Sequence, residues 1–238
     1  MTLILCHSPT GGVGTTFLSA QLSLALAARG HDVSAIDFAH ADALKLFFGL
    51  SPQQQLPLLG ESAVDDMVVD GVALSTGYEA SQRKGFAQAL EEAGPQLFGA
   101  RRVVIADVAS ADIALKKRLR PHAALHLCTL MPRPASLAAL ARIEPGTPTI
   151  DVEGIGFVLN QVDDTRKLSR HSKILLEELF EDGLIGTVRR DEAVNEALAS
   201  FQPIARYARQ SVVLGDIARL AAAVEARCGL TVAEAPVE

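Results

Sequence analysis

Short apolar runs alternate along the chain with longer segments in which apolar residues recur every three or four positions. Runs of the first kind are typical of strands buried on both faces, and segments of the second kind are typical of amphipathic helices. The first run, LILCH, covers 3–7 and precedes a helical pattern at 16–29. Within that pattern Leu18, Leu22 and Leu26 fall on one face. Further strands are predicted at 33–37, 72–76, 103–107, 124–130, 154–160 and 184–188, and further helices at 83–94, 171–181, 191–200 and 211–228.

This alternation predicts an α/β fold with three layers, in which a mostly parallel sheet carries helices on both faces. Sheets of this kind bind ligands beyond the carboxyl ends of their strands. A chain of 238 residues can bury a large core, so we expect one domain over 1–238, with about 229–238 as a flexible tail. The segment 51–70 is predicted to be a surface connection.

Composition narrows the functional classes. The formal net charge of −6 argues against broad, sequence-independent DNA binding, although a local basic patch stays open. Aromatic residues make up only 5% and Trp is absent, which argues against base-stacking surfaces. Cys6, Cys128 and Cys228 are far apart, so neither a disulfide framework nor a zinc motif is expected. The chain has no signal-peptide pattern and no uncharged apolar stretch of about 20 residues. We therefore expect a cytoplasmic protein that does not insert into a membrane.

The segment HSPTGGVGTTFLSA at 7–20 joins the end of a predicted strand to the start of a predicted helix. Its glycines let main-chain N–H groups turn inward, and the helix N-terminus adds partial positive charge, which together suit a nucleotide phosphate. Thr16 stands where phosphate loops place the hydroxyl that binds Mg²⁺, whereas the usual lysine before it is replaced. A tight turn that binds nothing is the alternative interpretation. The candidate nucleotide-binding residues of this loop are Gly11, Gly12, Val13, Gly14, Thr15 and Thr16.

Polar residues after the strand VVIAD give a second group of candidates. Asp107 ends that strand, where a carboxylate is suited to holding Mg²⁺ through water. The alternative is a plain polar residue at a strand end. Asp112 is expected to cap the next helix, and the basic run at 116–120 is interpreted as a solvated helix face.

The motif GGVGTT, together with the strand VSAID at 33–37, resembles the MinD/ParA family of deviant Walker A ATPases. The loop of that family usually reads KGGxGK[ST], and both of its lysines are replaced here, by Thr10 and Thr15. The stretch 187–211 is similar to the last strand and helices of the family. The resemblance covers nearly the whole chain and implies a P-loop fold that binds ATP and Mg²⁺. It also implies a homodimer with ATP held between two facing loops.

The resemblance assigns further residues to the site. It implies that Asp37 lies near the metal, and it implies that an acidic residue which activates water is replaced by Ala39. Asn160 corresponds to the residue that recognises adenine, and Arg189 and Asp191 begin the loop that packs on the base. Other interpretations stay open, because Asp37 can cap its strand, Asn160 can bond its own turn, and an arginine in this loop can be a solvated surface residue.

Within the family, the chain is most similar to the BcsQ-type accessory proteins of bacterial cellulose secretion, which also carry Thr in the loop. This similarity implies an ATP-binding switch with weak or absent hydrolysis, a small partner protein, BcsR, and the inner-membrane cellulose synthase complex. Two alternatives remain. One is an active ATPase that positions a septum, plasmid or pilus apparatus, and the other is a scaffold that binds no nucleotide.

Overall fold

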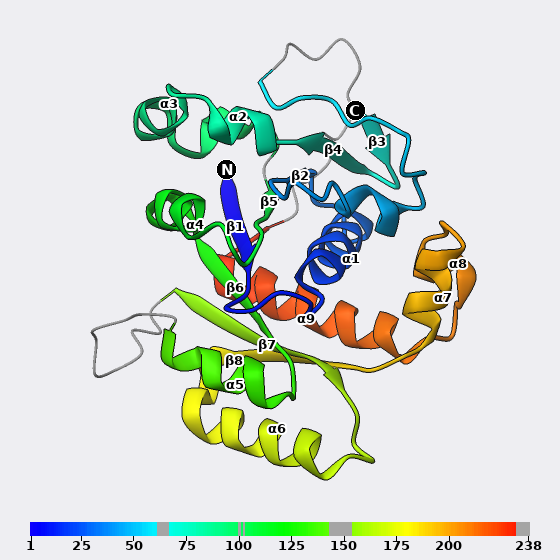
Figure 1. Cartoon of the computed structure of the whole chain (residues 1–238). Coiled ribbons are helices and arrows are strands. Elements are labelled where there is room, and N and C mark those ends of the chain that lie inside the picture. Colours follow the sequence, from blue (N-terminus) through cyan, green and yellow to red (C-terminus); the bar gives the residue numbers. More distant parts are fainter. Residues whose placement is uncertain (61–66, 100, 102, 143–153, 232–238) are drawn as a thin grey trace.

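The computed structural model describes residues 1–60, 67–99, 101, 103–142 and 154–231 (Figure 1). Within these ranges, eight strands form one sheet in the order β3-β4-β2-β5-β1-β6-β7-β8. The strands are β1 (Thr2–His7), β2 (Val33–Asp37), β3 (Met67–Val69), β4 (Val72–Thr76), β5 (Val103–Asp107), β6 (Leu125–Leu130), β7 (Ile155–Val162) and β8 (Leu184–Arg189). Every neighbouring pair is parallel except β3 and β4.

Helices cover both faces of this sheet (Figure 1). The α-helices are α1 (Thr15–Ala28), α2 (Tyr78–Gln82), α3 (Phe86–Ala93), α4 (Ile113–Leu119), α5 (Pro134–Ala138), α6 (Lys167–Phe180), α7 (Ala193–Ala199), α8 (Ile204–Tyr207) and α9 (Val212–Cys228). The 3-10 helices are η1 (Leu44–Phe48), η2 (Gly94–Phe98), η3 (Arg120–His122), η4 (Ala139–Arg142) and η5 (Glu181–Gly183). None of the helices in the described ranges is both long and apolar enough to cross a bilayer.

The alternation of side chains along β1 shows how the layers are joined. Ile4 and Cys6 belong to the core under α1 and α9, whereas Leu3 and Leu5 belong to the core under α3 and α4. All four residues are fully buried, because successive side chains of a central strand point to opposite faces of the sheet. A third apolar cluster lies between α6 and the strands β6 and β7. The expected three-layer α/β fold is therefore confirmed.

The seven predicted strands are all present, with bounds within two residues of those expected. The prediction missed β3, which lies in the segment interpreted as a connection and pairs antiparallel with β4. Asp70 and Gly71 form the turn between them, with φ of 46° and 83°. A strand of three residues is too short to show a pattern. The short helices α2, α5 and α8 were missed for the same reason, and α6 begins four residues before its predicted start. Most of the predicted tail lies outside the described residues.

The strand order fixes where a ligand can bind. β1 lies between β5 and β6, so the connections that leave β1 and β5 run to opposite halves of the sheet. In open parallel sheets this reversal opens a crevice at the carboxyl ends of the strands. The glycine-rich loop after β1 begins at this crevice.

Candidate nucleotide-binding site

The glycine-rich segment forms the turn that joins β1 to α1 at the carboxyl edge of the sheet. Gly12 and Gly14 have φ of +73° and +87°, so the turn depends on glycine at both positions. Gly14 is the N-cap of α1, and its carbonyl accepts the main-chain N–H of Leu18 at 3.0 Å. No described side chain caps this helix end, so the first N–H groups of α1 are left for water or a ligand.

Asn160 holds the turn from strand β7. Its side chain is buried, and Nδ2 donates a hydrogen bond to the carbonyl of Val13 at 2.8 Å. A Cβ atom on Gly14 would lie only 2.4 Å from this Nδ2, so β7 and the turn require glycine at that position. The alternative in which the Asn160 side chain hydrogen-bonds within its own turn is therefore not observed, because Nδ2 bonds to the glycine-rich turn instead. Its amide oxygen takes part in none of the described hydrogen bonds.

Asp107, at the end of β5, is a buried carboxyl group with a perturbed pKa. Its Oδ1 accepts the hydroxyl of Ser19 at 2.8 Å, and the hydroxyl of Thr16 also favours the charged form of this carboxyl. Burial raises the pKa of Asp107 to about 7, the charge of Asp37 adds to this rise, and the two hydroxyls oppose it. The group therefore carries a desolvation cost that a nearby cation would offset.

Asp37 ends β2 and lies opposite Asp107 in the sheet register. Its Oδ1 accepts the main-chain N–H of Ala39 at 2.8 Å, and its Oδ2 accepts that of Leu44 at 3.0 Å. Burial raises the pKa of Asp37 to about 6, although these two hydrogen bonds favour the charged form. Both oxygens therefore organise the turn after β2, in agreement with the interpretation of Asp37 as a cap.

The residues Thr16 and Asp107 fit a magnesium site that is completed by phosphate. Among the described residues, no group of three or more His, Cys, Asp or Glu side chains can hold a metal by itself. Mg²⁺ is commonly held by one or two carboxylates together with substrate phosphates and water. The raised pKa of Asp107 reverses when a divalent cation binds beside it, since the cation stabilises the carboxylate.

A pocket of about 360 Å³ opens beside the turn. Its lining residues come from the turn, α1, η1, the segment after β6, the ends of β7 and β8, the segment and helix α7 that follow β8, and α9. They are Gly14, Phe17, Phe47, Arg133, Asn160, Gln161, Arg189, Arg190, Asp191, Val194, Asn195, Leu198 and Val213. The rings of Phe17 and Phe47 meet edge to face, with centroids 5.6 Å apart. The pocket thus combines aromatic and aliphatic walls with a few polar groups, as small-molecule sites do.

Several of these lining residues were not predicted from the sequence. Arg133 follows β6 at the same edge of the sheet as the loop, so the rule that ligands bind at strand ends gives a signal for it. Phe17 and Phe47 carry no such signal, because a buried aromatic residue on a helix is ordinary core.

Arg189 and Asp191 line the pocket while also fixing its wall. Arg189 donates from its main-chain N and Nε to the buried Asp216, both at 2.9 Å, and so ties the end of β8 to α9. Asp191 accepts the hydroxyl of Ser211 at 2.6 Å and the main-chain N–H of Ala193 at 3.0 Å. Both side chains are thus engaged in structural hydrogen bonds at the rim of the pocket.

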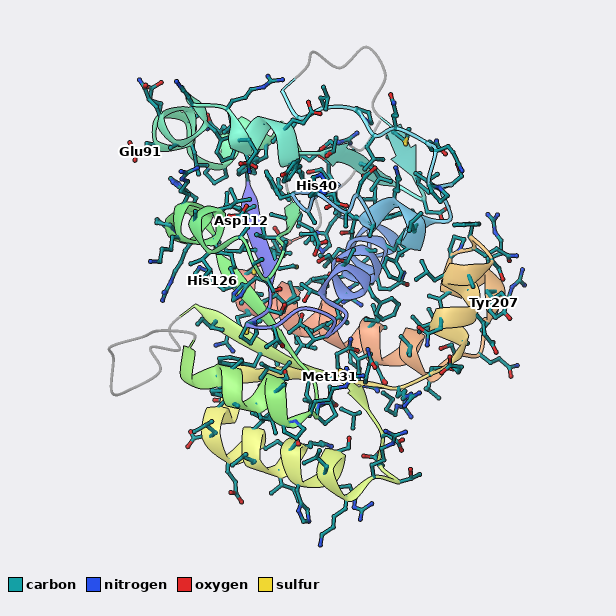
Figure 2. All side chains as sticks on the ribbon, viewed as in Figure 1. His40, Glu91, Asp112, His126, Met131 and Tyr207 are labelled. Carbon is teal, nitrogen blue, oxygen red and sulfur yellow. The ribbon has the colours of Figure 1, made fainter. Side chains whose placement is uncertain are left out.

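Three further polar residues near the loop, Asp112, His40 and Lys116, have different surroundings. Asp112 caps α4 by accepting the N–H of Leu115 at 2.9 Å, as predicted. His40, which Figure 2 labels together with Asp112, packs edge-on against Tyr78. His40 and Asp112 both line a separate groove of about 670 Å³ between α2 and α4. Lys116 is half-buried and donates to the main-chain carbonyls of Ser110, between β5 and α4, and of Ser8, at the start of the loop, so its interpretation as a solvated residue was wrong.

A glycine turn between a buried strand and an open helix N-terminus, with carboxylates at the ends of β5 and β2, defines a P-loop nucleotide-binding protein. The model of the CobQ/CobB/MinD/ParA nucleotide-binding domain matches residues 4–204. The chain therefore belongs to this family. A comparison with curated protein sequences gives no match.

Solved structures of the family share the fold at low sequence identity. The MinC:MinD cell division complex of Aquifex aeolicus is 16% identical, with a TM-score of 0.72 over 100% of this chain and 98% of that chain. MinD of Pyrococcus horikoshii, complexed with Mg-ADP, is 17% identical, with a TM-score of 0.70 over 94% and 96%. A variant of Cyanothece McdA, in complex with ATP, is 17% identical, with a TM-score of 0.70 over 97% of both chains.

Proposed function

We propose that the chain is an ATP-binding molecular switch of the MinD/ParA type. It acts as an accessory and localisation factor in bacterial cellulose synthesis and secretion, and binding rather than turnover is its signal. The observation that carries the nucleotide assignment is the glycine turn, with its uncapped α1 N-terminus beside a pocket of about 360 Å³. Complexes of two family structures with Mg-ADP and ATP support it.

In this proposal the triphosphate lies on the turn and the purine base enters the pocket. Phe17 and Phe47 offer the base an apolar wall, and the amide oxygen of Asn160 can accept a hydrogen bond from an amino group of the base. The proposed nucleotide-binding residues are Gly11, Gly12, Val13, Gly14, Thr15, Thr16, Asn160, Arg189 and Asp191. The last two contribute by shaping the pocket wall.

Mg²⁺ is the proposed cofactor. Thr16 and Asp107 would hold it, and Asp37 would contribute negative charge from the adjacent strand. When bound, the ion neutralises phosphate charge. Ser19 keeps the carboxyl of Asp107 oriented through its 2.8 Å hydrogen bond.

Hydrolysis is proposed to be weak or absent. Thr10 and Thr15 carry no positive charge to stabilise a transferring phosphoryl group. Ala39 offers no carboxylate to orient water. Two nearby polar side chains, His40 and Asp42, do not substitute in this structure, because His40 packs on Tyr78 and Asp42 pairs with Lys45.

The proposed assembly is a homodimer with ATP between two facing loops. The similarity of GGVGTT and of the segment 187–211 to BcsQ-type proteins supports the cellulose assignment. Its proposed partners are BcsR and the inner-membrane cellulose synthase complex, and these partners would bring a cytoplasmic protein to the membrane. The net charge of −6 favours protein partners over nucleic acid.

The test is nucleotide binding by the wild-type protein and two glycine variants. Thermal shift and calorimetry with Mg²⁺–ATP should show stabilisation, which reaches about 2.7 kcal/mol when ligand is at 100 times Kd. Gly14→Ala should abolish it, because the new Cβ meets Asn160 at 2.4 Å. Gly85→Ala is the matched control, since a Cβ there meets nothing within 4 Å. Absence of binding by the wild-type protein at millimolar ATP would favour the scaffold instead.

Two further measurements separate the remaining alternatives. Phosphate release well above background in the presence of Mg²⁺–ATP would favour an active ATPase that positions a septum, plasmid or pilus apparatus. In cells of the source bacterium, the Gly14→Ala allele should lower cellulose output while the Gly85→Ala allele should not. Equal cellulose output from both alleles, with both proteins present at normal levels, would contradict the cellulose assignment.

A further inference from the structure

Lys116 of α4 reaches the start of the glycine turn. Its Nζ donates to the carbonyl of Ser110 at 2.7 Å and to the carbonyl of Ser8 at 3.4 Å. Ser8 directly follows β1, and its hydroxyl donates to the carbonyl of Thr10 at 2.8 Å. The ammonium group therefore lies against the main chain where the loop begins, although it is about 100 residues away in sequence.

We propose that Lys116 supplies the ammonium charge that the loop itself lacks, and that it contacts the phosphate groups of a bound nucleoside triphosphate from the side of α4. The inference rests on the proposed nucleotide binding. It adds a phosphate-binding residue that lies outside the loop motif. The segment 8–16 contains no lysine or arginine of its own, so an ammonium from another element is the available kind of compensation.

The hydrogen bonds of Lys116 leave its charge available. A lysine ammonium has three donors, and the two described acceptors are neutral carbonyls. Two neighbours could in principle cancel the charge. The carboxylate of Asp112 caps α4 by accepting the N–H of Leu115 and attracts Lys116 without accepting any of its described hydrogen bonds. Burial raises the pKa of the Cys128 thiol to about 12, so Cys128 stays neutral. Burial lowers the pKa of Lys116, and the negative charge of Asp112 opposes this shift.

Two features of the loop itself point to the same role. The hydroxyl of Thr15, at the position of the usual lysine, is buried and has no hydrogen-bond partner among the described residues. The side chain of Thr15 is also too short to cross the loop as a lysine does. On the other side of the loop, a Cβ on Gly11 would lie 3.4 Å from Oγ of Ser110. The segment that holds Lys116 is therefore packed directly on the loop.

The test compares Lys116→Gln with Lys117→Gln. Glutamine keeps an N–H donor for the two carbonyls but removes the charge. Lys117 is exposed on the same helix, so its variant makes the same change in net charge away from the loop. Calorimetry with Mg²⁺–ATP, Mg²⁺–ADP and AMP should show that Lys116→Gln weakens ATP about 10- to 100-fold. It should weaken AMP much less, and Lys117→Gln should change each affinity by less than about twofold.

A rescue experiment separates charge from structure. If the ammonium is what matters, Thr15→Lys should restore most of the lost ATP affinity in the Lys116→Gln protein and add less to the wild type. Lys116→Met, assayed in parallel, keeps the measurement possible if the glutamine variant folds poorly. An equal loss of AMP, ADP and ATP affinity would mean that Lys116 only braces the loop, and would overturn the inference. Unchanged ATP affinity in Lys116→Gln would overturn the role of Lys116 and leave the proposed nucleotide binding intact. Absence of ATP binding by the wild-type protein would overturn both the role of Lys116 and the proposed function.

Discussion

Replacing Asp107 with asparagine should stabilise the ligand-free protein at alkaline pH. The pKa of Asp107 rises from 3.8 to about 7, mainly because the carboxyl is buried and secondly because Asp37 is charged. The folded state then binds a proton more tightly than the unfolded state does. Stability therefore falls as the pH increases from about 4 to about 7, where the unfolded state has already lost its proton.

The size of the effect follows from the two pKa values. A pKa of about 7 against an ordinary 3.8 corresponds to about 4 kcal/mol above pH 7, at about 1.4 kcal/mol per pH unit. About 2–3 kcal/mol of that difference develops between pH 5 and pH 8. Asparagine keeps the Oδ1 acceptor for the hydroxyl of Ser19 but carries no charge. The free energy of unfolding of Asp107→Asn, relative to the wild type, should thus increase by about 2–3 kcal/mol between pH 5 and pH 8.

Urea unfolding in EDTA at pH 5 and pH 8 measures this advantage. Asp182→Asn, at an exposed position, is a control that should change little with pH. If Asp107→Asn gains no more stability at pH 8 than at pH 5, the reasoning from burial is wrong. Adding Mg²⁺–ATP at pH 8 should make the wild type more stable than Asp107→Asn. The wild type has a carboxylate that can hold the metal, so ligand binding stabilises it more than the variant.

Three further predictions concern the pocket, the ion pair behind its wall and the cap of α4. Phe47→Ala should weaken AMP, ADP and ATP by a similar factor of about ten in calorimetry, because the base loses an aromatic contact while the phosphates lose nothing. Asp216→Asn should cost about 3 kcal/mol in urea unfolding at pH 7, because the hydrogen bonds of Arg189 lower the pKa of Asp216 against the effect of burial. That cost should shrink as the pH falls through the lowered pKa. Asp112→Ala should cost about 1 kcal/mol at pH 7, as loss of a helix cap does.

The central part of the fold could be predicted from the sequence because its signals are local. Strands such as β5 consist of five buried apolar or strand-ending residues, and the glycine turn has its own residue pattern. β3 could not be predicted, because three residues with mixed burial depend on pairing with β4 rather than on their own pattern. The start of α6 was missed because the only apolar residue of its first turn is Leu168, which is exposed and shows no helical pattern with its polar neighbours.

Those residues of the candidate site that lie at strand ends could be predicted from the sequence. Asp37, Asp107 and Asn160 each lie at or near the end of a strand, and parallel strands bring these ends to one edge. The contacts between them were not predictable, because they depend on the packing of distant segments. Lys116 is the clearest example, since its sequence neighbours form a basic run that is otherwise largely exposed. A polar pattern on a helix cannot reveal that one of its cations faces the main chain of another loop.

The distribution of charge around the turn bears on the proposal that the protein binds nucleotide with little hydrolysis. Two carboxyl groups with raised pKa values, Asp37 and Asp107, lie at the base of the site. The loop contributes dipoles but no cation, and the ammonium of Lys116 approaches from another element. Binding needs positive charge anywhere within reach of the phosphates, and main-chain N–H groups, Mg²⁺ and one lysine can provide it. Hydrolysis needs charge and a water-orienting group at fixed positions on the transferring phosphate, and Thr15 and Ala39 leave those positions empty. Under the proposed function, these substitutions would therefore leave an anion site in place while lowering the rate of hydrolysis.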